Sequence, residues 1–451
     1  MKKMILIAVI ASMAFPALSC SGASAQTSVT GGEKAVVDVS ASFAAIVSNY
    51  NLPGLMGQRL DGSSLTASGV AGVRVRGQNT NMLQAADVMH YGSMFKVQTA
   101  TMGGILVDTN VITWDALLLD YVTPSQKTAF IATDVRWTNV TLRQLLSMSS
   151  GIQEGLVPFD VATLYSYNTN PVAGRQYLVD ALSHSLLATD PGSAYYYSNF
   201  GYTMAGLMLE VAWNQFSGLS NTYEELMQQK LFGPLGITTA TQGAPGMSTT
   251  VLSNLPAADP SPVAIGHNAH TNDPAVGYPL GAPVGLGYVD ADNPLIITPA
   301  GAWAMGMDDY IKLLKVHMQT NQTALLDSLG LTFQTLLAIR TPVIVLPTTN
   351  AFSFALGWVV DNATTSHLVY TGSNVRWVSM VDVKLDQQVA VVAACNQGGT
   401  DPALHDAFAT LEAIPEPALG TLAVILCVRL RRRAQRGPAR TRGAVRQSML
   451  P

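Results

Sequence analysis

The order of strand-like and helix-like segments along an unbroken body constrains this chain most. No linker interrupts the sequence between about residue 28 and residue 412. Apolar and polar residues alternate over 69–76, which is typical of a strand. Strand-like runs also close the body, while helical spacing dominates its middle. This order predicts one α/β domain, closed by N- and C-terminal strands, with a helical insertion.

Periodicity and capping signals predict the individual elements. Thr141 can cap a helix that Gly151 ends. Near the end of another predicted helix, Met318 continues the apolar face while His317 turns away from it. Residues 386–388 form the expected turn between the last two strands. The predicted helices cover 93–107, 142–148, 199–211, 223–231 and 308–319, and the predicted late strands cover 352–360, 367–370, 377–384 and 389–395.

The distribution of charge argues against nucleic acid as a partner. The chain is 48% hydrophobic and only 12% charged, which favours a folded core over disorder. Its formal net charge is -4, although eight of the sixteen arginines lie at or beyond Arg429. The body is therefore clearly acidic, and phosphate binding needs a basic patch.

The N-terminus predicts export. Lys2 and Lys3 precede the apolar run 4–18, and small residues follow at 23–25. This pattern is typical of a secretory signal over residues 1–25, cut before Gln26. The alternative is a membrane anchor, but the run is shorter than the roughly 20 residues that a spanning helix needs. Lipid attachment at Cys20 is a minority alternative. We expect a periplasmic, cell-surface or extracellular protein.

The C-terminus resembles the PEP-CTERM sorting tags of bacterial surface proteins. A Pro-Glu-Pro sequence at 415–417 is followed by the apolar run 418–428 and an arginine cluster that begins at Arg429. We expect a sorting segment over 413–434 and a disordered basic tail over 435–451. A tail anchor is the alternative. In either case membrane contact is expected only through the terminal segments, with export and sorting proteases as partners.

Cysteine usage excludes an internal disulfide in the processed protein. Cys20 lies in the predicted signal and Cys427 in the predicted tag, which leaves only Cys395. Cys395 lies in an apolar run and is expected to be a buried strand residue.

Ser93 and Lys96 are the first candidate catalytic pair. Three residues apart, they share one face of a helix that begins near Ser93. A serine hydroxyl is a weak nucleophile until a base takes its proton. A lysine can be that base when burial or a neighbouring charge lowers its pKa. The helix N-terminus would offer N–H groups to an oxyanion. The alternative for this motif alone is a capping serine and a surface lysine.

Two further segments carry residues suited to the same chemistry. Tyr197 lies two residues before Asn199 at the start of a predicted helix. A phenol near an ammonium is easier to ionise, so Tyr197 can carry protons, and the amide of Asn199 can hold the lysine or a substrate. Gly372 lets a substrate approach a strand edge, where the N–H of Ser373 can face a carbonyl oxygen. Taken singly, each segment is better explained by packing, a helix cap or a turn.

Together, these segments resemble the serine β-lactamase-like family, which includes class C β-lactamases, D-alanyl-D-alanine carboxypeptidases and related esterases. The family signature is Ser-x-x-Lys, Tyr-x-Asn and then Lys- or His-Thr-Gly, in that order. Segment 141–151 is similar to the family's Leu-Leu-x-His-x-Ser-Gly, with Met148 in the place of His. The resemblance covers nearly the whole body, and its other matching segments are 232–236, 299–303 and 355–358.

The resemblance implies a fold and a set of roles. The fold is a β-lactamase/transpeptidase-like antiparallel sheet flanked by helices over 26–412. Ser93 would be the acylated nucleophile, Lys96 its proton partner and Tyr197 the general acid or base. The N–H groups of Ser93 and Ser373 would form the oxyanion hole. The substrate, a small molecule or a cell-wall peptide, would be hydrolysed by water without a metal or cofactor. Its expected contacts are Asn199, Tyr370, Thr371, Gly372 and Ser373.

The chain departs from the family pattern at Tyr370, where the family usually has Lys or His. A cation there would attract a substrate carboxylate, whereas a phenol supplies no charge. The departure favours an esterase or a peptidase that acts on less anionic substrates. Tyr370 and Met148 also keep open an alternative, a catalytically inactive surface protein of the same fold that binds cell-wall peptide or polysaccharide.

Other chemistries have less support. No Gly-x-Ser-x-Gly sequence occurs, which disfavours an α/β-hydrolase. His267 and His270 lie in a polar loop without a clear third ligand, which favours surface residues over a zinc site. No phosphate-binding glycine loop precedes a helix.

Overall fold

In the computed structural model, the described residues are 36–414, except for 75, 78, 155–156, 158–160, 244–292, 348–349 and 375; for 161–162 only the backbone is described. The chain divides into two units, Met1–Glu412 and Ala413–Pro451. The predicted signal 1–25, the tail 435–451, His267 and His270 lie outside the described residues. Only 413–414 of the predicted sorting segment are described.

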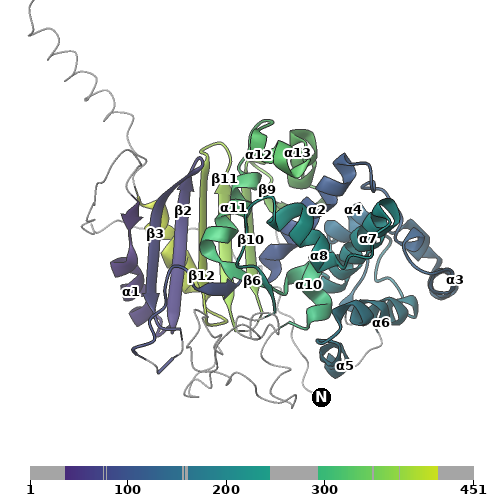
Figure 1. The fold of residues 1–451 in the computed structure, drawn as a ribbon, viewed down its shortest axis with the longest axis horizontal. Helices are drawn as coiled ribbons and strands as arrows, with labels where there is room; N and C mark the ends of the chain where they lie inside the picture. Colours follow the sequence, from purple (N-terminus) through teal and green to yellow (C-terminus); the bar gives the residue numbers. More distant parts are fainter. Residues whose placement is uncertain are drawn as a thin grey trace, which may run out of the picture. The chain divides into compact units, whose positions relative to one another are not determined.

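A nine-stranded sheet joins the two ends of the body (Figure 1). Strand β12 lies between β11 and β2, so that Val389 pairs with Asp61 and Cys395 with Leu55. All pairs of neighbouring strands are antiparallel except β1 and β3. The strand order is β1 (Val37–Asp38), β3 (Ser64–Gly72), β2 (Gly54–Asp61), β12 (Val389–Cys395), β11 (Val378–Lys384), β10 (His367–Ser373), β9 (Val359–Asp361), β8 (Phe352–Phe354) and β7 (Ile344–Val345).

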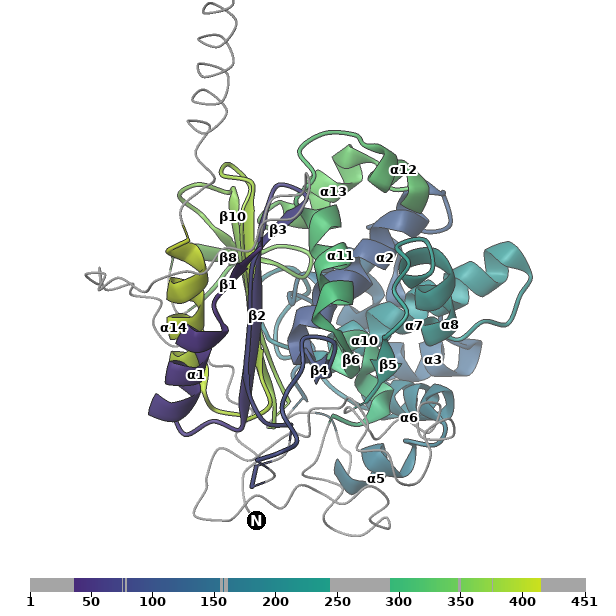
Figure 2. The same ribbon diagram turned by 60° about the vertical axis from the view of Figure 1, so that its left-hand side comes forward.

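Helices cover both faces of this sheet. Figure 2 shows α1 (Ser40–Asn49) and α14 (Asp401–Glu412) on one face and the other helices beyond the opposite face. The small second sheet has the order β4 (Val88–His90), β6 (Trp303–Gly306) and β5 (Thr241–Gln242). Among the described residues, the remaining α-helices are α2 (Lys96–Asp108), α3 (Pro124–Thr133), α4 (Leu142–Leu146), α5 (Val161–Ser166), α6 (Pro171–Ser183), α7 (Asn199–Ser217), α8 (Tyr223–Met227), α10 (Thr298–Gly301), α11 (Met307–His317), α12 (Ala324–Leu329) and α13 (Phe333–Arg340).

Coverage on both faces explains the composition of β12. Every residue of this strand is buried, so its sequence is an apolar run rather than an alternating one. The prediction that Cys395 is a buried strand residue is confirmed, and burial raises the pKa of its thiol to about 11. The predicted fold class is also confirmed, since strands from both ends form one sheet and helices dominate the middle.

Several predicted boundaries need correction. Helix α4 ends at Leu146, because Met148 already has a φ of 58° in the left-handed region. The predicted strand 352–360 is a hairpin of β8 and β9. At its bend, a Cβ on Gly357 would lie 2.8 Å from the Cα of Val97, so only glycine fits there. Strand β3 ends at Gly72 instead of Arg76.

The expectation that His317 turns away from the core is wrong. The side chain is fully buried. Its Nδ1 accepts a hydrogen bond from the Trp358 indole at 3.2 Å, and its Nε2 lies 3.0 Å from the Thr101 hydroxyl. A histidine can occupy an apolar face when both ring nitrogens have partners.

Helix α7 extends to Ser217, beyond the predicted end at residue 211. In the described part of the chain, no helix combines the length and hydropathy that crossing a membrane requires.

Candidate active site

Ser93 lies on a tight turn that packs against the end of β10. The turn is a 3-10 segment, Gly92–Phe95, which leads directly into α2. Gly92 has a φ of 52°, and a Cβ on it would lie 2.6 Å from the nitrogen of Ser373. A Cβ on Gly372 would lie only 1.9 Å from the carbonyl oxygen of Tyr91. Two glycines therefore let the backbone of β10 approach the Ser93 turn closely.

The amine of Lys96 is the point at which the predicted segments meet. Its side chain is fully buried at the start of α2. The Nζ atom lies 3.0 Å from Ser93 Oγ, 2.8 Å from the Tyr197 hydroxyl and 2.8 Å from Asn199 Oδ1. It also donates to the carbonyl oxygen of Ala300 in α10 at 2.5 Å. The Tyr197 hydroxyl in turn shares a hydrogen bond with Ser93 Oγ.

This environment suits Lys96 to the role of a base. Burial lowers the pKa of Lys96 to about 7, although the charge of Glu154 opposes the shift. An ammonium has only three protons, so it cannot donate to all four nearby oxygens at once. A neutral amine donates two hydrogen bonds and accepts one, which lets it take the proton of the Ser93 hydroxyl.

Tyr197 behaves differently from the sequence-based expectation. Burial raises the pKa of its phenol, and the hydrogen bond with Ser93 opposes the shift only in part. The Lys96 Nζ lies 4.8 Å from the centre of the Tyr197 ring. At neutral pH Tyr197 is therefore a protonated phenol, which suits a proton donor or relay between Ser93 and Lys96 better than a phenolate base.

Asn199 is the first residue of α7, and its side chain faces the lysine. The helix is capped by Ser198, whose hydroxyl accepts from the N–H of Gly201 at 2.9 Å. The Asn199 side chain is thereby left to accept from Lys96. The sequence left two positions open for Asn199, helix cap and partner of the lysine. In the structure Ser198 is the cap, and Asn199 contacts Lys96.

The third predicted segment lies on β10 beside this cluster. Tyr370 is only 5% exposed, and its hydroxyl has no hydrogen-bond partner among the described residues. Its ring lies edge-on to Phe354 at 5.9 Å. Burial raises the pKa of Tyr370, and the nearby Tyr197 adds to the shift, so the position is uncharged. Gly372 is buried, Thr371 is half-buried and Ser373 is exposed.

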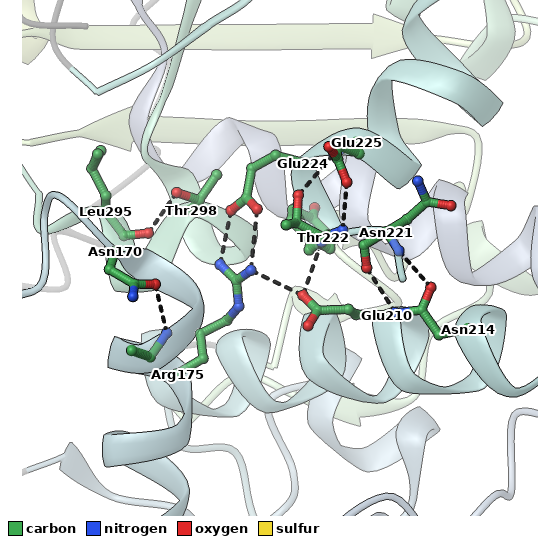
Figure 3. Close-up of polar contacts among 12 residues, drawn as sticks. Asn170, Arg175, Glu210, Asn214, Asn221, Thr222, Glu224, Glu225, Leu295 and Thr298 are labelled. Carbon is green, nitrogen blue, oxygen red and sulfur yellow. Dashed lines mark hydrogen bonds and ion pairs between the residues drawn. The ribbon is translucent and has the colours of Figure 1, made fainter. Parts of the chain in front are cut away.

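A buried ion cluster joins helices α6, α7 and α8 (Figure 3). Arg175 pairs with Glu210 at 2.9 Å and with Glu224 at 2.8 Å, and its side chain is completely buried. Glu210 also accepts from the N–H of Tyr223 at 2.9 Å. The Tyr223 hydroxyl contacts Thr99 at 2.8 Å, and Thr99 donates to the carbonyl of Pro299, next to Ala300.

Sequence reasoning missed three contributors to the site. Ala300 acts through its backbone carbonyl, which no side-chain motif can reveal. Glu154 binds the N–H groups of Asn199 and Phe200. Met148, noted only as a departure from the family, accepts from the N–H of Ser198 through its sulfur at 3.1 Å. Within the described residues, no three His, Cys, Asp or Glu side chains gather in a way that could hold a metal ion.

Known proteins similar to this chain share its fold. The family model described as Beta-lactamase matches residues 23–414. A penicillin-binding protein homologue from Pyrococcus abyssi matches with a TM-score of 0.62 and 17% identity, over 82% of this chain and 75% of that one.

Two further solved structures match over nearly their whole length. The penicillin binding protein from Bacillus halodurans has a TM-score of 0.59 and 19% identity, over 83% of this chain and 99% of that one. The D-alanine carboxypeptidase AmpC from Burkholderia cenocepacia has a TM-score of 0.58 and 17% identity, over 83% and 98%. No curated protein matches the chain. The family model nonetheless spans most of the sequence, and the chain therefore belongs to the beta-lactamase family, whose members are serine hydrolases.

Proposed function

We propose that this protein is a serine hydrolase that cleaves an ester or amide through a covalent acyl-enzyme. The observation that supports the proposal most is that one buried amine, that of Lys96, lies within hydrogen-bond distance of both Ser93 and Tyr197. Ser93 Oγ attacks the substrate carbonyl carbon, and its proton passes to Lys96. The N–H groups of Ser93 and Ser373 stabilise the oxyanion.

Each proton can be followed as the acyl-enzyme forms and is then hydrolysed. When the tetrahedral intermediate collapses, the proton held by Lys96 passes through the Tyr197 hydroxyl to the leaving alcohol or amine. Water attacks the acyl carbon next, Lys96 takes its proton, and Ser93 Oγ recovers a proton as the acid leaves. The net reaction consumes one water for each bond cleaved.

The substrate class is proposed from the chain's own residues and from its structural relatives. One structural relative is a D-alanine carboxypeptidase, and another is SurE, whose crystal structure was solved with D-Leu. These names support tests on D-amino-acid peptides and β-lactams. The uncharged, buried Tyr370 favours esters or other weakly anionic substrates, since no cation stands at that position to pair with a substrate carboxylate.

The decisive experiment is activity-based labelling with a fluorophosphonate, followed by peptide mapping. We expect the label on Ser93 and turnover of a chromogenic short-chain ester, with both lost in Ser93→Ala. The proposal fails if esters, β-lactams and D-amino-acid peptides all go unhydrolysed and Ser93 stays unlabelled.

A non-catalytic surface protein that binds cell-wall peptide or polysaccharide is the second candidate. The observations that favour it are the uncharged Tyr370 and the Met148 that replaces the family's His. Pre-steady-state kinetics distinguish the two candidates, because a burst of product reveals an acyl-enzyme and eliminates the pure binder.

Export and C-terminal sorting remain part of the proposal on the strength of the two terminal sequences. We expect the mature protein to begin at Gln26 and to lack the residues that follow the Pro-Glu-Pro sequence. The intact mass of the protein isolated from its native host tests both cuts. A mass that includes every residue through Pro451 contradicts the sorting signal.

A further inference from the structure

Two residues that follow α4 bind four backbone N–H groups of the segment that carries Tyr197 and Asn199. The carbonyl of Met148 accepts from the N–H of Tyr196 at 2.7 Å, and its sulfur accepts from that of Ser198 at 3.1 Å. Glu154 Oε1 accepts from the N–H of Asn199 and, at 3.2 Å, from that of Phe200. The bonds of Met148 thus flank Tyr197 on both sides.

The left-handed backbone conformation of Met148 makes both of its hydrogen bonds to the Tyr197 segment possible. Its φ of 58° is in the left-handed region, which costs free energy for a residue other than glycine. The side chain is 1% exposed. In this conformation the carbonyl and the thioether of one residue both point at the Tyr197 segment. A thioether is a weak acceptor, but a buried N–H without a partner would cost more.

Glu154 is connected to Lys96 through one residue. The N–H of Asn199 binds Glu154, and the side chain of the same Asn199 accepts from Lys96. The carboxylate also lies at the N-terminus of α7, where the helix dipole favours a negative charge.

Glu154 is the carboxylate that acts on the charge of Lys96. It raises the pKa of the amine against the effect of burial. Phenols also lie near this amine, since the ring centres of Tyr197 and Tyr202 lie 4.8 Å and 5.5 Å from Nζ, and Tyr197 in turn adds to the raised pKa of Tyr370. Burial keeps all three protonated at neutral pH.

We propose that Met148 and Glu154 are positioning residues of the hydrolase: Met148 fixes Tyr197 from both sides, and Glu154 fixes Asn199 and through it connects a carboxylate to Lys96. The inference rests on the proposed function and deepens it, because it names the parts of the chain that align the acid–base group with the nucleophile.

Glu154→Gln separates the charge of this residue from its hydrogen bonds. The amide oxygen still accepts from Asn199 and Phe200, while the carboxylate charge is lost. We expect the acid limb of the pH profile of kcat/KM to move to lower pH by about one unit, the effect of one opposite charge nearby. Glu225→Gln is the matched control, since Glu225 caps its own helix at the N–H of Thr222. It should leave the profile unchanged.

Met148→Leu removes the sulfur acceptor and keeps the apolar volume. We expect kcat to fall about tenfold across the pH range, with little change in KM, since the loss acts on alignment rather than on substrate binding. Met208→Leu is the control, because Met208 is a fully buried methionine of α7. Thermal unfolding of both variants separates misfolding from misalignment.

The outcomes separate this inference from the function on which it rests. If the wild-type protein hydrolyses esters while both variants keep its kcat, KM and pH profile, the positioning roles are overturned and the hydrolase stands. If the wild-type protein neither turns over nor labels at Ser93, the hydrolase fails.

The pKa of Lys96, measured by NMR of carbon-13-labelled lysine, then decides the role of Glu154, and the amide shift of Ser198 decides that of Met148. A pKa that stays constant in Glu154→Gln, or a Ser198 amide unmoved in Met148→Leu, rejects the corresponding role.

Discussion

At the scale of single residues, the pKa of Lys96 governs the expected pH dependence. Burial lowers this pKa to about 7, and the amine must be uncharged to take the Ser93 proton. We therefore expect kcat/KM for a neutral ester to fall as the pH drops below about 7. The raised pKa of Tyr197 keeps its phenol protonated, so no further limb is expected under mildly alkaline conditions.

A pH profile of wild-type kcat/KM with an uncharged substrate tests this prediction. An acid limb near the ordinary lysine value of 10.5 would contradict it. Lys96→Met is the control for the assignment, since it should lower kcat at least a hundredfold and leave no limb that depends on the amine.

Tyr370 is the residue from which we predict substrate preference. Its buried hydroxyl has no partner among the described residues, so Tyr370→Phe should change the kcat/KM for either kind of substrate little. Tyr370→Lys places a cation where the family usually has one. We expect the ratio of kcat/KM for a carboxylate-bearing β-lactam to that for a neutral ester to rise about tenfold. An equal effect on both substrates would argue against a charge-based role.

The motif residues were open to sequence analysis for a physical reason. Ser93 and Lys96 are fixed relative to each other by helical spacing, and their apolar neighbours predict burial. Glu154 carries no comparable signal, since it meets Asn199 across 45 residues of chain. The pKa of Tyr197 was misjudged because sequence reveals the nearby charge but not the extent of desolvation.

At the scale of elements, the contact between β10 and the Ser93 turn leaves no room for an added side-chain atom. A Cβ on Gly372 would lie 1.9 Å from the Tyr91 carbonyl oxygen, so Gly372→Ala must push the strand away from the turn. In the proposed mechanism that displacement separates the N–H groups of Ser93 and Ser373, and we expect the loss of one oxyanion donor to lower kcat about a hundredfold or more.

Steady-state kinetics of Gly372→Ala, together with its thermal unfolding, check this prediction. Gly103→Ala, within helix α2, serves as the comparison, because the nearest atoms to a Cβ there belong to side chains, the Trp114 ring at 3.2 Å and Leu146 at 3.5 Å. If both variants retain wild-type kcat, the close approach of β10 does not matter for turnover.

Element types were predicted better than element ends. The capping box of Thr141 and Gln144 marks the start of α4 in the sequence. Its early end depends on tertiary contacts of Met148 that no local pattern carries. His317 is a similar case, since its burial requires Thr101 and Trp358 from two other elements.

At the scale of the whole molecule, a buried cation joins three helices of the central region. Arg175 of α6 binds Glu210 of α7 and Glu224 of α8, and none of the three side chains is more than 9% exposed. Arg175 is the member whose loss costs most, because its removal leaves two buried carboxylates without a cation. The same network continues through Tyr223 and Thr99 to the backbone beside Ala300.

Removal of Arg175 should therefore affect stability far more than removal of a surface arginine. Arg175→Met leaves two buried carboxylates unpaired, and we expect the free energy of unfolding to fall by about 3–5 kcal/mol. Arg143→Met breaks an exposed pair with Asp115, whose members are 36% and 78% exposed, and should cost at most about 1 kcal/mol. Urea denaturation of both variants measures the difference. Equal losses would mean that the buried cluster contributes no more than a surface pair. Partial recovery in a triple variant that adds Glu210→Gln and Glu224→Gln would show that the unpaired carboxylates, rather than lost packing, cause the effect.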